Sequence, residues 1–489
     1  MNPLVAAVVP GLPFAAAIAL GLIGDRRIRG WPIGIWVNLA AAGATLLAAL
    51  GFAVQPPASS SALLLADPLA RHFALLAGFI GFTAACAELG RPPAQEPAWR
   101  PHLALALGQA FLGAVLAALM TNSLVVTVVA AEAASLALAV AAALPRTPDA
   151  MRTAWTRMVT AGLAGGLALF GVILLSVAAL PAQGPNAPAL TWTTLPEAAA
   201  ASQGALLSLG SVLLLVGAGA MAMLAPLHLW ISDPGQAPPA PAMTAPLMTT
   251  LAITVILRLR QAIADNADAV VPGPTVLLLG LFALLIAALA LGRQRDARRF
   301  VAVATIGQGG IVAIAIGLGT SAAVFAGVLH LTLATLVLTA LLSPAATGIR
   351  MGGGQAANRR SLAGSAGLGL TIAAGLIALA GLPPFGLFSS VLLIVMAAAH
   401  GAPLLLVPLG AGLGLGAWAM LARLPTPGLP GAATSRPEPA PRAAPWAQTM
   451  IVVPMIVVPW LHLALTALLG LAMPIPLVRW FATIAGSLG

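Results

Sequence analysis

The sequence contains no lysine and little charge of either sign. All 22 basic residues are arginine, and charged residues make up only 7% of the 489 positions, whereas 60% are hydrophobic and the mean hydropathy is +1.02. A water-soluble domain cannot hide so large an apolar fraction from solvent. The scarcity of charge therefore argues against a soluble protein and predicts an all-α protein that crosses a bilayer many times.

Cysteine is represented only by Cys86, which lies inside an apolar run. A single cysteine excludes an intramolecular disulfide, and the cysteine and histidine spacings fit neither an iron–sulfur cluster nor a haem pair. No glycine-rich nucleotide-binding loop stands at a strand–helix junction either. We therefore expect no metal, no cofactor and no catalytic residue in this chain.

Apolar runs of about 20 residues, the length that one bilayer crossing needs, predict about 14 transmembrane segments. They lie at 4–24, 33–54, 70–88, 102–120, 123–144, 157–180, 204–232, 240–260, 274–292, 299–319, 321–343, 363–400, 402–422 and 448–472. Two runs are too long for one crossing and contain prolines near their middle: Pro226 in 204–232, and Pro383 and Pro384 in 363–400. We expect both to be discontinuous helices.

The arginines gather between alternate apolar runs. Eighteen of the 22 fall in loops on one side of the predicted bundle, which the positive-inside rule makes the cytoplasmic side. This pattern places both termini on the outer face of a bacterial-type inner membrane, and it explains the net charge of +10 better than nucleic-acid binding does. The exceptions, which we expect to extend from helix ends towards the headgroups, are Arg71, Arg258, Arg260 and Arg479.

The two broken segments divide the chain into four regions. Residues 1–120 form N-terminal transmembrane helices, 121–260 a first repeat broken at Pro226, 261–400 a second repeat broken at Pro383-Pro384, and 401–489 the C-terminal helices with a Pro-rich cytoplasmic linker at 423–447. Corresponding interruptions in two halves of a chain predict an inverted repeat. We expect the last residues, 474–489, to form a short interfacial helix.

Four motifs between residues 120 and 400 carry a resemblance to a known family. They are LAPLHLWISDPGQAPPAPAMTA, RDARRFVAVATIGQGG, VLHLTLATLVLTALL and LAGLPPFGLF. The first and last resemble the broken seventh and twelfth helices of the antiporter-like membrane subunits of respiratory complex I and its relatives, and the other two resemble segments between them. The GLPPFGLF form is more similar to the membrane subunits of group 4 energy-converting hydrogenases, such as component F of hydrogenase-4.

The resemblance implies a row of buried charges that carries protons at mid-membrane. Carried over residue by residue, the glutamate of that row falls on Glu132 and the central histidine on His330; with His228, beside the first break, these are the proton-relay candidates. The other charged positions of the row are lost to Met221 on the seventh helix, Leu338 beyond the central histidine and Val391 on the twelfth helix, and Ala334 stands at a second histidine position.

Each relay candidate also has a structural interpretation. Glu132 without a cation partner is expected to stay uncharged near pH 7, where it either relays a proton or hydrogen-bonds to a neighbouring helix. His330 allows the same two roles. His228 lies two residues after Pro226 and is suited to satisfy backbone groups that the proline leaves free.

The resemblance predicts an integral membrane subunit of a redox-linked, proton-translocating complex of the hydrogenase or NADH:quinone oxidoreductase type. Its expected partners are other membrane subunits, the lipid bilayer and peripheral redox subunits, and any iron–sulfur, nickel–iron or quinone site belongs to those partners. The missing lysines favour an alternative, a scaffold that keeps the fold but no longer pumps. A cation/proton antiporter and a bicarbonate-uptake module use the same fold and remain open.

Overall fold

The computed structural model describes residues 3–28, 31–55, 61, 63–89, 100–183, 190–228, 239–266, 268–270, 272–294, 297–343, 366–424 and 445–488. This part of the chain is almost entirely helical. Its strands, β1 (Arg27–Ile28) and β2 (Trp31–Pro32), form one short antiparallel hairpin. The all-α fold predicted from the composition is confirmed.

The helices overlap every apolar segment expected from the sequence. Their bounds are α1 Pro3–Ile23, α2 Ile33–Val54, α3 Pro68–Glu88, α4 Pro101–Met120, α5 Leu124–Ala143, α6 Pro148–Gln183, α7 Leu195–Ala200, α8 Gly204–Met221, α9 Pro239–Thr244, α10 Pro246–Ile263, α11 Pro272–Leu291, α12 Ala297–Leu318, α13 Ser321–Leu341, α16 Ala366–Leu379, α17 Gly386–Gly401, α18 Leu406–Leu421, α19 Pro445–Leu471 and α20 Ile475–Gly486. A 3₁₀ turn, Pro403–Leu405, precedes α18.

Fewer helices than 14 qualify as complete crossings. Within the described residues, eleven are long and apolar enough to span a bilayer, or twelve when the bent pair α19 and α20 counts as one span. The apolar part of α1 (Ala7–Ile23) is too short for this criterion, as are both halves of the second broken segment, α16 and α17.

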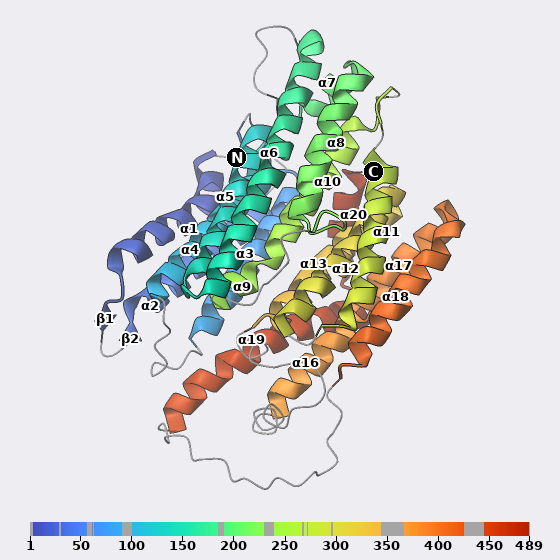
Figure 1. Ribbon diagram of the computed structural model, residues 1–489. Helices are drawn as coiled ribbons and strands as arrows, with labels where there is room; N and C mark the ends of the chain where they lie inside the picture. Colours follow the sequence, from blue (N-terminus) through green and yellow to red (C-terminus); the bar gives the residue numbers. More distant parts are fainter. Residues whose placement is uncertain are drawn as a thin grey trace.

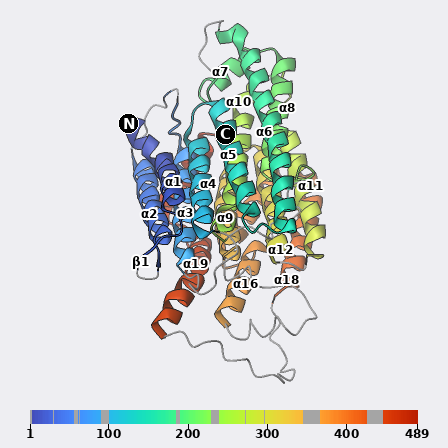
Figure 2. The ribbon, with the colours of Figure 1, turned by 60° about the vertical axis from the view of Figure 1, so that its left-hand side comes forward.

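The helices form one elongated bundle in which α13 is central. Figure 1 shows α1 and α2 at one edge, α17 and α18 at the opposite edge, and both chain ends towards the same end of the bundle. At that end α6, α7 and α8 extend beyond the other helices (Figure 2). Helix α13 packs against α3, α10, α12, α16, α17, α19 and α20. Of its most apolar stretch of 18 residues, 94% is buried inside the protein.

The first broken segment ends α8 in a glycine-type cap that has no glycine. Met223 has a left-handed φ of 64°, its N–H donates to Ala220 O (3.1 Å), and the N–H of Leu224 reaches back to Gly219 O (2.9 Å). This pair of bonds is a Schellman motif, which satisfies carbonyls that the end of a helix leaves free. The Ala225-Pro226 peptide that follows is cis.

The second broken segment repeats this geometry. Gly381 has φ 69° and donates to Ala378 O (3.0 Å), Leu382 donates to Ile377 O (3.3 Å), and the Pro383-Pro384 peptide is cis. The left-handed residue, the leucine and the cis proline follow one another at the same spacing in both breaks. Helix α8 therefore ends before Pro226, and the second segment is broken between α16 and α17, with one shared backbone geometry at both places.

The shared cap predicts different effects for two substitutions. A Cβ at Gly381 would meet nothing closer than Val391 at 3.8 Å, so Gly381→Ala is expected to lower the free energy of unfolding by about 1 kcal/mol through its left-handed φ alone. Met223→Gly is expected to be close to neutral, because relief of the left-handed φ, about 1 kcal/mol, offsets the packing that the partly buried methionine side chain loses. Equilibrium unfolding in detergent measures both, and equal destabilisation by the two would contradict the assignment.

One arginine that departs from the positive-inside pattern is held inside the protein. The Arg258 side chain is only 5% exposed, and its Nη2 donates to Asp67 Oδ1 (3.0 Å) and Oδ2 (3.1 Å). Asp67 also caps α3 by accepting from Ala70 N (2.6 Å). Two other exceptions donate to backbone carbonyls, Arg71 to Gln55 (2.6 Å) and Arg260 to Gly319 (3.3 Å). Extension towards the headgroups is therefore the wrong explanation for Arg258.

The C-terminal helix α20 lies across the end of α19. Helix α20 bends by 89° from the apolar part of α19 and buries Phe481 and Ile484 on the face that packs against α3 and α13. Gln261 at the end of α10 donates to Ser487 O (2.5 Å). A short helix therefore forms at the predicted residues, with one face against the bundle and the other exposed. Its position at the membrane interface stays a prediction.

Candidate functional site

His330 lies near the middle of α13 and is completely buried. Its Nε2 is 2.8 Å from Gln308 Oε1 on α12, and its Nδ1 is 2.8 Å from Ser390 Oγ on α17. Both ring nitrogens are therefore hydrogen-bonded by side chains from neighbouring helices. Neither Gln308 nor Ser390 stood out in the sequence, because a lone glutamine or serine in an apolar run carries no spacing signal.

Gln308 connects the histidine to the second break. Its Nε2 donates to the carbonyl of Leu379 (3.1 Å), the last residue of α16. The carbonyls of the last helical turn have no partner within the helix, so a side-chain donor satisfies one of them here. His330, Gln308 and the broken helix thus form one hydrogen-bonded unit.

The partners of His330 accommodate both of its protonation states. A glutamine oxygen only accepts, so in this network Nε2 carries a proton. The Ser390 hydroxyl has two acceptors within reach, His330 Nδ1 and Leu387 O (2.9 Å). When the imidazole is neutral, the hydroxyl donates to Nδ1; when Nδ1 is protonated, Nδ1 donates to Oγ and the hydroxyl turns to the carbonyl. Rotation of the Ser390 hydroxyl is therefore enough to accommodate a change in the protonation state of His330.

A second buried histidine, His72 on α3, has no such freedom. Its Nδ1 accepts from the indole N–H of Trp480 (3.1 Å), which can only donate. Its Nε2 is 2.8 Å from Thr332 Oγ1, whose hydroxyl donates to Val328 O (2.8 Å). These partners hold His72 in one neutral tautomer, which makes it a structural group that joins α3, α13 and α20.

A third buried histidine, His462 on α19, was also missed from the sequence. Its Nδ1 lies 3.2 Å from Leu336 O and its Nε2 2.9 Å from Thr83 Oγ1, which also reaches Ile80 O (3.1 Å). This arrangement has the same rotatable hydroxyl as the one at His330. The available signal was a histidine inside a continuous apolar run, which is costly in a membrane unless it is hydrogen-bonded.

Glu132 projects from α5 towards α6. Its Oε2 is buried and has no hydrogen-bond partner among the described residues. A Cβ at Gly165 on α6 would lie 2.9 Å from Glu132 Cδ and closer still to Oε2, so the glycine makes room for the carboxyl group. Within the described part of the chain, no hydrogen bond links Glu132 to His330. No hydrogen bond joins Glu132 to a neighbouring helix there either, so the structural interpretation of Glu132 has no such bond to support it.

Adding a methyl group beside Glu132 provides a test of this packing. Gly165→Ala is expected to lower the free energy of unfolding by about 1–3 kcal/mol, because the carboxyl group must leave its position. Gly166→Ala is the matched control on the same helix, since a Cβ there meets nothing within 4 Å. Adding Glu132→Ala to Gly165→Ala is expected to recover most of the loss; unfolding in detergent with no difference between the two glycine variants would refute the contact.

The lost charge positions are apolar sites, two of them buried and the third beside a cavity. Met221 and Leu338 are 5% and 3% exposed. Val391 lines a cavity of about 330 Å³ beside the second break, together with Gln308 and Leu379. All three positions carry uncharged, apolar side chains, so the family's charges are absent from them.

His228 follows the first break and is half-buried. Its Nδ1 is buried and has no hydrogen-bond partner in the described structure, so the expected satisfaction of freed backbone groups is not seen there. Residues 229–238, which complete the first signature motif, lie outside the described residues. The described side chains contain no group of three or more His, Cys, Asp or Glu that could hold a metal.

Comparison with known proteins gives a consistent result. Residues 121–415 match the family model described as NADH:quinone oxidoreductase/Mrp antiporter, transmembrane. The chain is 31% identical over 428 residues to a hydrogenase-4 component F homolog from Methylacidiphilum infernorum, covering 83% of this chain and 86% of that protein. It is 29% identical over 394 residues to NADH-quinone oxidoreductase subunit N from Rhodopseudomonas palustris, covering 76% and 78%.

Two solved structures share the fold over the whole chain. One is from the membrane-bound sulfane sulfur reductase, an archaeal respiratory membrane complex, with a TM-score of 0.78, 20% identity and coverage of 99% of this chain and 97% of that chain. The other is from the Mrp complex of Dietzia sp. DQ12-45-1b, with a TM-score of 0.77, 19% identity and coverage of 100% and 98%.

Proposed function

This chain belongs to the NADH:quinone oxidoreductase/Mrp antiporter membrane family, and from that premise we propose that it carries protons as one membrane subunit of a multisubunit, redox-linked complex. The observation that carries the proposal is the site of His330, whose two ring nitrogens are bonded by partners that fit both protonation states. A buried imidazole that can accept and release a proton with one hydroxyl rotation meets the basic requirement of a relay.

The second break supports this role. The hydrogen bond from Gln308 to Leu379 O connects the partner of His330 to the end of α16. Gln308, Leu379 and Val391 also line the cavity beside this break. Unwound backbone at membrane depth is tolerated where it lines a cavity or is buried in protein. In this proposal the break and the cavity give protons access to His330, although the family's charge at Val391 is lost.

The two breaks also support the finer topology. Schellman caps with the same pattern of hydrogen bonds are what two copies of one repeat would retain. The arginine distribution is that of 14 crossings with both termini on the outer face of a bacterial-type inner membrane. The chain ends lie towards the same end of the bundle (Figure 1). Iron–sulfur, nickel–iron or quinone sites are assigned in this proposal to partner subunits.

Proton uptake by proteoliposomes tests the proposal. The complex that co-purifies with the full-length chain is reconstituted, and protons taken up per electron are compared between wild type and His330→Gln. Glutamine keeps hydrogen-bonding groups but cannot take up a proton near neutral pH, so uptake is expected to fall at least about tenfold while electron transfer continues.

An exposed histidine provides the control. His400 on α17 bonds only to the Met396 carbonyl in its own helix (2.8 Å), so His400→Gln is expected to leave uptake unchanged. If His330→Gln keeps the wild-type number of protons per electron, the chain is a scaffold and the pump lies in another subunit.

A further inference from the structure

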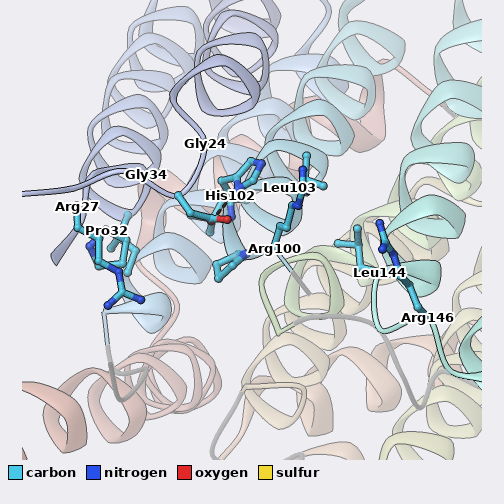
Figure 3. A pocket seen from close by; sticks show the side chains of 13 residues that line it. Gly24, Arg27, Pro32, Gly34, Arg100, His102, Leu103, Leu144 and Arg146 are labelled. Carbon is cyan, nitrogen blue, oxygen red and sulfur yellow. Dashed lines mark hydrogen bonds and ion pairs between the residues drawn. The ribbon is translucent and has the colours of Figure 1, made fainter. Parts of the chain in front are cut away.

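A basic pocket lies at the arginine-rich end of the bundle, away from the His330 site. It has a volume of about 460 Å³ and is formed where α1 and α5 end and where α2 and α4 begin. Three arginines from separate segments line it: Arg27, Arg100 and Arg146. Figure 3 shows Arg27 on one side of the pocket and Arg146 on the other, with His102 between them.

The acidic group of the pocket is already engaged. Asp25 Oδ1 is 2.7 Å from His102 Nδ1 and also lies 3.5 Å from the backbone N of His102 in the first turn of α4. No carboxylate in the described part of the chain pairs with Arg100 or Arg146. Since the carboxylate of Asp25 is bonded to His102, the guanidinium groups of Arg100 and Arg146 leave the pocket with an excess of positive charge.

Arg100 and Arg146 line the same cavity from separate segments, and neither has a carboxylate partner among the described residues, so both would stabilise an anion bound there. Guanidinium groups bind phosphate oxygens through paired, charge-assisted hydrogen bonds. The first turn of α4 also contributes the positive end of its helix dipole. The pocket therefore has the chemistry of a phosphate site.

Apolar surface continues from the pocket into the region that the bilayer covers. Ile35, Leu103 and Leu144 line the cavity itself. Leu22 and Trp36, on the two helices beside it, are 78% and 50% exposed. An amphipathic aromatic residue at a helix end is typical of the headgroup region of a membrane.

We propose that this pocket binds the phosphate headgroup of an anionic phospholipid, whose acyl chains lie along the exposed apolar faces of α1 and α2. Basic pockets between transmembrane helices on the arginine-rich side recognise such headgroups. A free phosphate ion would use the same guanidinium groups but would make no use of the adjoining apolar surface. The site is independent of the proton relay, since none of its lining residues belongs to the His330 network.

Native mass spectrometry of the delipidated full-length chain in detergent tests the site. Phosphatidylglycerol is titrated against phosphatidylcholine with the same acyl chains, and inorganic phosphate serves as a competitor. Wild type is expected to bind phosphatidylglycerol at least about tenfold more tightly than phosphatidylcholine. The double variant Arg100→Gln/Arg146→Gln is expected to lose that preference.

Arg152→Gln is the matched control. Arg152 is an exposed arginine on α6, 3.7 Å from Asp149 and outside the pocket, and its loss is expected to leave the preference intact. Thermal unfolding of each variant in the same detergent confirms that it is folded. An equal loss in Arg152→Gln, or an unchanged preference in the double variant, overturns the proposal. Displacement of the lipid by millimolar phosphate overturns the lipid assignment in favour of a free-phosphate site.

Discussion

Replacing Ser390 with alanine is expected to slow proton uptake by the reconstituted complex at least about tenfold, with electron transfer and assembly preserved. The substitution removes the one hydroxyl that serves His330 Nδ1 in both protonation states. In the variant, neutral His330 loses its donor and protonated His330 loses its acceptor. Proton uptake by proteoliposomes, followed with a pH-sensitive dye during turnover, gives the rate.

Trp480→Phe is a control of the same kind. It also removes one hydrogen bond to Nδ1 of a buried histidine, here His72, but the bond is one that the indole can only donate. Its effect is expected on stability, at about 1 kcal/mol, and not on proton uptake. Equal slowing by the two variants, or none by Ser390→Ala, would show that the hydroxyl is structural.

Removing the charge of Asp67 is expected to give the largest loss of stability. In Asp67→Asn the amide oxygen still caps α3, but Arg258 remains buried without its counter-ion. Breaking a buried ion pair in this way costs about 3–5 kcal/mol, and the lower end applies because the Asp67 side chain is 29% exposed. Equilibrium unfolding in detergent measures the change in the free energy of unfolding.

The double variant separates charge from packing. In Asp67→Asn/Arg258→Met the charge of Arg258 is removed together with that of Asp67, and among the described residues only Arg71 remains as a buried charge near this position. The thioether can still pack beside Trp192, over whose ring the guanidinium lies 5.9 Å from the centroid. Most of the lost stability is therefore expected to return. A double variant as unstable as Asp67→Asn alone would mean that hydrogen bonding to the carboxylate, and not charge pairing, holds this end of the bundle together.

The functional residues were only partly accessible from the sequence. Motifs singled out His330 and Glu132 because the family's order of segments places them, and both lie within helices as expected. Motif reasoning did not identify Ser390, and it placed Gln308 within the quoted segment RDARRFVAVATIGQGG without indicating that it contacts His330. It also passed over His462, whose partners come from α3 and α13, far away in the chain.

What the sequence by itself determined was the class of molecule and the places where its helices break. The length of the apolar runs requires helices, because the hydrocarbon core offers no other partner for backbone groups. The prolines at 226, 383 and 384 interrupt those runs whatever the surroundings.

Only the tertiary structure decided which polar groups meet. Helix α13 lies at the centre of the bundle, so side chains from α3, α12, α17, α19 and α20 converge on or beside its residues. The protonation behaviour of each buried histidine depends on whether the facing partner can reverse its hydrogen bond: a serine hydroxyl can and an indole cannot. That choice is made by packing between segments up to several hundred residues apart, and no local pattern in the chain encodes it.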